Sequence, residues 1–196
     1  MLNVGEVVML LLIVGLVVFL GIHSVRIAAP EWRDRQIAMN EGRWKGIYSL
    51  ISLVGFVLLV WGYARAREVA PILYEPPVWM KHITVGLMLF SFISLAVFIF
   101  PSGRLKPIVK HPLLVAVKIW AFAHLLANGD LASLILFIAV LAWAVTDRIA
   151  VGRRGETAPQ TGPVTWDIYA VALGAVLYVL FVWRLHLWLI GVPPLP

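Results

Sequence analysis

Hydrophobic residues form long, nearly uninterrupted runs along this 196-residue chain, and short polar connections separate them. A helix needs roughly 20 apolar residues to cross a bilayer core of about 30 Å. A transmembrane barrel would instead show short segments of alternating polarity. The pattern predicts an all-α integral membrane protein, a bundle of about six transmembrane helices that forms a single transmembrane domain over residues 1–196. The predicted helices lie near residues 6–28, 46–64, 82–100, 112–127, 131–147 and 166–191.

The fourth and fifth predicted helices form a short hairpin. Residues 112–127 would rise only about 24 Å as a helix, less than a full bilayer core. Pro112 suits the first helical turn, where its missing N–H is not needed. The turn "NGD" at 128–130 offers an asparagine that tolerates left-handed geometry, a glycine that closes one helix and an aspartate that caps the next.

Three connections differ in character. Residues 28–46 contain two tryptophans among charged residues, which indicates an amphipathic turn of helix in the membrane interface. Residues 68–81 hold three prolines and two aromatic residues, and we expect an irregular interfacial loop there. Residues 151–167, rich in Gly, Pro and Thr, predict a flexible loop.

Composition narrows the class of protein further. The chain is 62% hydrophobic and 13% charged, and it has no cysteine, which excludes disulfides, thiolate catalysis and iron–sulfur clusters. The connections after the odd-numbered helices carry eleven Lys and Arg residues, against three on the other side. The positive-inside rule therefore predicts a multi-pass protein of the bacterial inner membrane with both termini in the periplasm. Because the basic residues lie in short connections, we expect no nucleic-acid partner.

Ionisable residues within membrane spans are expensive, so each is a candidate for function. Five such residues lie within the predicted helices: His23, Lys118, His124, Arg184 and His186. Lys118 has a side chain long enough to reach the interface, and Arg184 lies near the outer end of its helix. His82 and His111 lie at helix ends, where interfacial water can satisfy them.

His124 shares a helix face with Leu113, Val117, Trp120 and Asn128, because these residues recur at spacings of three or four. We expect this face to point into the bundle. A buried neutral imidazole is a good ligand for iron or zinc when its other ring nitrogen has a partner. An equally open interpretation is a histidine hydrogen-bonded across helices, with Trp120 and Asn128 as packing residues.

His23 lies near the end of the first helix, with Arg26 three residues further on the same face. Such a pair can hold a haem by its iron and by a propionate. The alternative is an interfacial histidine beside an anchoring arginine. Two buried histidines on different helices are typical of six-coordinate haem b in a helical bundle, whereas zinc and di-iron sites need more ligands than the spans offer.

Three segments resemble the signatures of the NnrU family. "HPLLVAVKIWAFAHLLANGDLASLILF" resembles the hallmark segment of the family, and "HSVRIAAP" and "GRWKGIYSLISL" resemble the other two signatures, in the same order. Lys118, Ile119 and the pair Trp44–Lys45 depart from the usual residues. The resemblance implies a single NnrU-like domain over residues 1–196.

The resemblance also implies a function. Bacterial NnrU proteins are associated with denitrification and nitric oxide metabolism. The similar plant 15-cis-ζ-carotene isomerases use haem b in a redox-dependent cis-to-trans isomerisation. Carried over to this chain, the catalytic haem ligands fall on His23 and His124, and a further histidine of the family falls on His111.

The predicted haem b site also includes Arg26, on the face of His23, and Trp120 and Asn128, on the face of His124. The predicted depth in the membrane argues for a different partner of His124, because His186 lies nearer to the depth of His124 than His23 does. His186 is therefore the substitute for His23 as the second haem ligand. The expected partners are membrane lipid, a polyene or isoprenoid substrate and an electron donor. The competing prediction is a cofactor-free assembly factor or small transporter.

Overall fold

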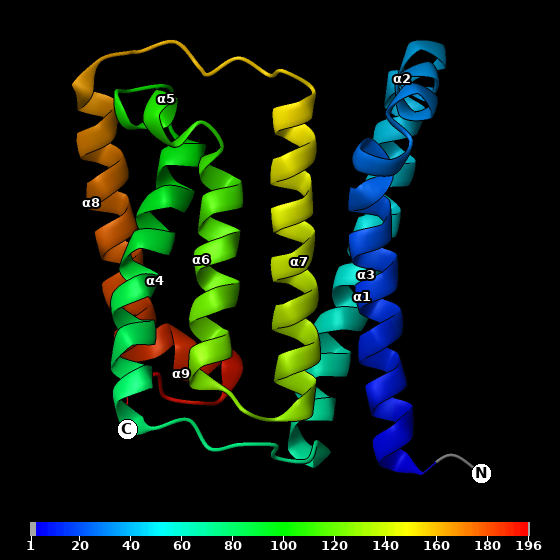
Figure 1. Ribbon diagram of the computed structural model, residues 1–196, viewed down its shortest axis with the longest axis vertical. Helices are drawn as coiled ribbons and strands as arrows, with labels where there is room; N and C mark the ends of the chain where they lie inside the picture. Colours follow the sequence, from blue (N-terminus) through cyan, green and yellow to red (C-terminus); the bar gives the residue numbers. More distant parts are fainter. Residues whose placement is uncertain (1–2, 196) are drawn as a thin grey trace. The chain divides into compact units, whose positions relative to one another are not determined.

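The computed structural model describes residues 3–195, and its regular structure is helical throughout these residues (Figure 1). The prediction of an all-α membrane protein is confirmed, and each predicted run forms a helix. Five segments are long and apolar enough to cross a membrane: α1 (Val4–Ala28), α3 (Glu41–Val69), α4 (Val78–Ile99), α7 (Leu131–Arg153) and the segment Val164–Ile190. The sixth, α6 (Pro112–Ala127), is shorter, as its length predicts.

The chain divides into two compact units. Unit 1 contains residues 1–73 and 130–139, and unit 2 contains residues 74–129 and 140–196. The division falls within α7, whose first part belongs to unit 1 and whose remainder belongs to unit 2.

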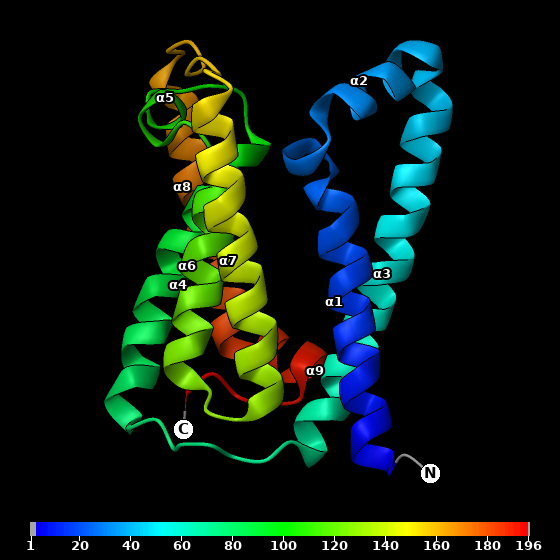
Figure 2. The same ribbon diagram turned by 45° about the vertical axis from the view of Figure 1, so that its right-hand side comes forward.

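Unit 1 is built on the antiparallel pair of α1 and α3 (Figure 2). Glycines let the two helix backbones approach closely, as is typical where helices pack within a membrane. A Cβ atom added to Gly62 would lie 2.5 Å from the backbone nitrogen of Leu12, and one added to Gly15 would lie 2.4 Å from that of Leu59. Gly55 faces Phe19 in the same way. The glycines therefore set the register of the pair.

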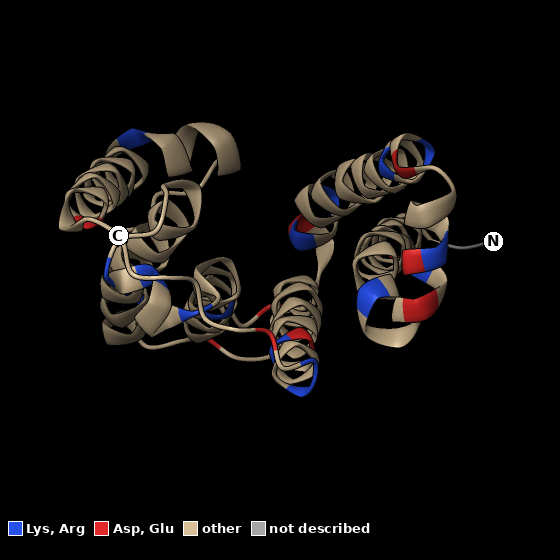
Figure 3. Cartoon of the chain, turned by 90° about the horizontal axis from the view of Figure 1, so that it is seen from above, with Lys and Arg blue, Asp and Glu red and all other residues tan. Residues whose placement is uncertain are grey.

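The charged connection in unit 1 is helical. α2 (Pro30–Met39) joins α1 to α3 and carries acidic and basic residues together (Figure 3). Its Trp32 ring packs edge-on against Trp44 of α3, with ring centroids 5.4 Å apart. Asn40 caps α3 by accepting a hydrogen bond from the amide of Arg43. The helical turn expected here is present, but α2 buries no residue.

The start of α7 is fastened within unit 1. The Asp130 carboxylate accepts a hydrogen bond from the amide of Ser133 at 2.9 Å, so the predicted cap of this helix is confirmed. The hydroxyl groups of Ser133 and Tyr63, on α3, lie 2.9 Å apart in a hydrogen bond. A buried serine thus finds its partner on a neighbouring helix.

In unit 2, α4 packs against both α6 and α8 (Val164–Leu180). Thr84 and Ser91 of α4 donate hydrogen bonds to backbone carbonyls of α6, at 2.8 Å to Ala123 and at 2.9 Å to Ala116. Both hydroxyls are buried, so each must find an acceptor within the protein. These two bonds fix the register of α4 against α6.

The connections at one end of unit 2 are tied together. The short helix α5 (Leu105–Val109) begins where the Asp167 carboxylate of α8 accepts hydrogen bonds from the amides of Arg104 and Leu105. The connection from α7 to α8 is bound to residues 102–103 through hydrogen bonds at Gln160 and Gly162. The loop predicted over 151–167 is shorter than expected, because α7 continues to Arg153 and α8 begins at Val164.

Two local predictions also need correction. Asn128, which ends α6, is extended at φ −128° and ψ 134° rather than left-handed. A Cβ on Gly129 would lie 1.9 Å from the Tyr74 carbonyl oxygen, so this glycine serves close approach. The run 166–191 is not one regular helix, because a π-helical turn, Phe181–Leu185, separates α8 from α9 (His186–Ile190).

The glycine contacts of unit 1 predict a matched pair of stability changes. Gly62→Ala forces a methyl group against the backbone of α1, and we expect a loss of about 1–3 kcal/mol. Gly46→Ala, in the same helix, meets nothing within 4 Å and should stabilise the helix by about 0.5–1 kcal/mol. Thermal unfolding in detergent measures both changes. Equal midpoints for the two variants would contradict the close packing of α1 and α3.

Candidate functional site

His124 lies half-buried in the last turn of α6. Its Nδ1 donates a hydrogen bond to the Trp120 carbonyl at 2.8 Å, since a carbonyl oxygen can only accept. In the neutral ring the lone pair is then on Nε2, which is the tautomer that binds a metal through Nε2. The Trp120 ring lies beside it, with centroids 5.3 Å apart. Trp120 thus orients the imidazole in two ways.

The end of α6 is held by a residue that the sequence did not single out. The Tyr74 hydroxyl contacts the carbonyls of Leu125 and Asn128, each at 2.9 Å. The Asn128 side chain donates to the His124 carbonyl at 2.8 Å, so it closes its own helix instead of bridging to another. An aromatic residue in a proline-rich connection was the only available signal for Tyr74. Together these contacts hold the backbone around His124.

His186 is the residue that the structure brings to His124. The two rings lie 6.4 Å apart between centroids, and their planes differ by 23°. His186 Nδ1 donates to the Val192 carbonyl at 2.6 Å, so its lone pair is also on Nε2. Gly191 takes a positive φ of 80° and ends α9. The chain turns there, and the Val192 carbonyl then accepts the hydrogen bond from the His186 ring.

The separation of the two ring centroids can be compared with that of two imidazoles bound to one metal. With metal–nitrogen bonds of about 2.0 Å and about 1.1 Å from Nε2 to the ring centre, two ligands in line would have centroids roughly 6.2 Å apart. The measured separation of 6.4 Å is close to this value. Within residues 3–195 no group of three or more His, Cys, Asp or Glu side chains could hold a bare metal ion. The two residues that the structure brings together here are both histidines.

His23 has the same local design in unit 1. Its Nδ1 donates to the Phe19 carbonyl at 2.7 Å, and its ring packs against Phe19 and Tyr48 with centroids 4.4 Å and 5.4 Å away. Arg26 follows in the last turn of α1 and is exposed. The structure describes His23 only within its own unit, so its pairing with His124 stays a prediction.

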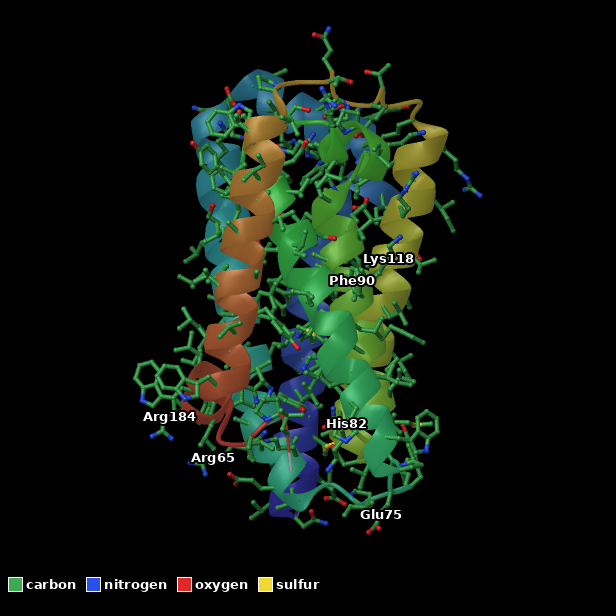
Figure 4. All side chains as sticks on the ribbon, turned by 90° about the vertical axis from the view of Figure 1, so that its left-hand side faces the viewer. Arg65, Glu75, His82, Phe90, Lys118 and Arg184 are labelled. Carbon is green, nitrogen blue, oxygen red and sulfur yellow. The ribbon has the colours of Figure 1, made fainter. Side chains whose placement is uncertain are left out.

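The other ionisable candidates differ in exposure. Figure 4 shows Arg184 pointing outward, His82 at the start of α4 and Lys118 near the middle of α6. His82 and Arg184 are exposed, and Lys118 is half-buried. Leu113 was predicted to lie on the inward face of α6, but it is 39% exposed, so this prediction is wrong. Another set of residues makes the closest packing of α6. That set is Leu114, Ala116, Ala121 and Ala123.

Residues 11–194 match the family described as NnrU protein. The chain belongs to the NnrU family. No curated protein and no solved structure gives a match. The match to the NnrU family contains all five histidines of the chain, including His124 and His186.

His111, at the start of α6 in this NnrU protein, predicts a measurable pH effect. Partial burial, followed by the nearby Arg148 guanidinium, lowers the pKa of His111 below its usual value. As the pH falls, His111 binds a proton at a higher pH in the unfolded chain than in the folded protein. The folded protein therefore loses stability as the pH falls below about 6.5. In His111→Gln the unfolding midpoint should depend less on pH over this range.

Arg148→Gln provides the companion test, because removing the guanidinium should raise the pKa of His111 and reduce the loss of stability in acid. Unfolding midpoints across the pH range measure both variants. A slope that neither substitution changes would show that His111 does not set the pH dependence.

Proposed function

We propose that this NnrU protein binds haem b in the membrane and that His124 and His186 would hold its iron. The observation that carries the proposal is the histidine pair, 6.4 Å apart, in which each Nδ1 donates to a backbone carbonyl. When bound, the haem would supply an iron that changes redox state and ligand number.

The chain's own residues prepare the ligands. The carbonyls of Trp120 and Val192 fix the tautomer of each ring and raise the basicity of Nε2. Tyr74 and Asn128 restrain the last turn of α6, so His124 needs little reordering to bind. Half-burial among apolar helices limits the access of water, which is one of the ways in which a protein sets a haem potential.

The activity that we propose for this site is a redox-dependent cis-to-trans isomerisation of an apolar polyene or isoprenoid. Such a reaction needs no acid or base from the protein, and the substrate would share the lipid phase with the apolar helices. Support comes from the family resemblance and from the histidine pair. A haem role in denitrification or nitric oxide metabolism rests on the same ligands and differs in the reaction.

Absorption spectra of the detergent-purified protein, as isolated and after dithionite, test the haem. We expect sharp reduced α and β bands that are lost in His124→Ala and in His186→Ala. His82→Ala is the matched control, because His82 is an exposed histidine of the same unit and its loss should leave the bands intact.

His23→Ala decides the second ligand. Bands lost in His23→Ala but retained in His186→Ala would assign the iron to His23 and His124, as the resemblance implies. No haem after reconstitution with excess hemin would overturn the proposal and favour the cofactor-free assembly factor or transporter. With haem established, conversion of a cis polyene by the reduced protein, absent in the oxidised protein, tests the isomerase; binding of nitric oxide without conversion would favour nitrogen-oxide metabolism.

A further inference from the structure

The helix that carries His186 contains an extra residue just before it. In an α-helix the amide of His186 would donate to the carbonyl four residues back, whereas here it donates to Phe181, five residues back. The π-helical turn Phe181–Leu185 therefore accommodates one residue more than a regular helix would over the same rotation.

The extra residue changes the direction in which His186 points. Gly174 marks the face of α8 that packs on α4, since a Cβ there would lie 2.6 Å from the Ile93 Cα. At about 100° per residue, an uninterrupted α-helix would place His186 about 120° around the axis from Gly174. With one residue absorbed by the π turn, the angle is about 20°.

The neighbouring aromatic residues agree with this rotation. Phe181 is the first residue of the turn and packs on Phe92 of α4, with ring centroids 5.0 Å apart. Trp188 follows the turn and would lie about 40° from Gly174 in an uninterrupted helix, on the packed face. It is instead 79% exposed. The face of the helix has shifted by one residue between Phe181 and Trp188.

We propose that the π-helical winding of Phe181–Leu185, which absorbs one residue of this segment, is a positioning device that brings His186 against His124. If the same residues were wound as an unbroken α-helix, His186 would point away from α6, and Trp188 would lie on the packed face. The functional value of this positioning rests on the proposed haem function. The direction in which His186 points can be measured without any cofactor. π-helical turns are frequent at functional sites, where they reorient a side chain.

Cross-linking measures this geometry directly, because the natural chain has no cysteine. The parent is the full chain with His124→Cys and His186→Cys, treated in membranes with a short bis-maleimide that spans the gap left by the two shorter side chains, and the bridged peptides are quantified by mass spectrometry. Two length variants are made in it. One lacks Val182, and the other has an alanine inserted between Val182 and Trp183.

The two length variants should behave oppositely. Deletion converts the π turn into a regular α-helix and leaves residue 186 at about 20° from Gly174, so cross-linking should stay within about twofold of the parent. Insertion turns residue 186 by about 100°, so cross-linking should fall at least about tenfold. Efficient cross-linking after insertion, or its loss after deletion, would overturn the proposal, as would a parent that does not cross-link.

A second cysteine pair separates rotation from misfolding. Ser91→Cys with Ala116→Cys reports the contact of α4 with α6, which does not involve the π turn. In both length variants this cysteine pair should cross-link as efficiently as it does in the chain without the deletion or the insertion. A failure of haem binding leaves all these results unchanged, so the positioning and the haem proposals fail separately.

Discussion

Every backbone polar group within a bilayer must find its partner inside the protein, and this constraint underlies the structure. Helices satisfy it along most of the chain. Where a helix is too short, ends early or changes its winding, side chains supply the missing donors. The histidines obey the same constraint, because His23 and His124 donate Nδ1 to a carbonyl one turn back, and His186 donates to the tail. The tautomer of all three rings is thus a consequence of satisfying carbonyl groups in an apolar solvent.

Much of this fold could be predicted from hydrophobic runs, because membrane helices need length and apolar character more than specific contacts. Pro112 and Asp130 also mark helix starts by local chemistry that acts within a few residues, and both stand where predicted. The conformation of Asn128 was not predictable, because it depends on Tyr74, which is distant in sequence. The loop from α7 to α8 likewise depends on acceptors and donors in residues 102–103.

The candidate site was predictable in its parts and not in its arrangement. His124 and His186 stand out as ionisable residues within apolar runs, and the similar depth that the sequence predicts for them favours a pairing. The sequence does not indicate how the last helix is wound. An unbroken α-helix through residues 166–191 would direct His186 away from His124. No proline or glycine marks the π turn in "FVWRL", so its cause lies in tertiary packing, with Phe181 held on α4.

Tyr74 gives α6 an unusual independence from the surrounding lipid. Long helices respond to bilayer thickness by tilting, and a residue on such a helix changes depth with the membrane. α6 stops after 16 residues, and its last carbonyls are met by a phenol from a connection of the same unit. Contacts within the protein therefore set the depth of His124 in the membrane, rather than the position of the lipid headgroups. Membranes of different thickness would deform around this helix while the imidazole kept its level relative to Tyr74.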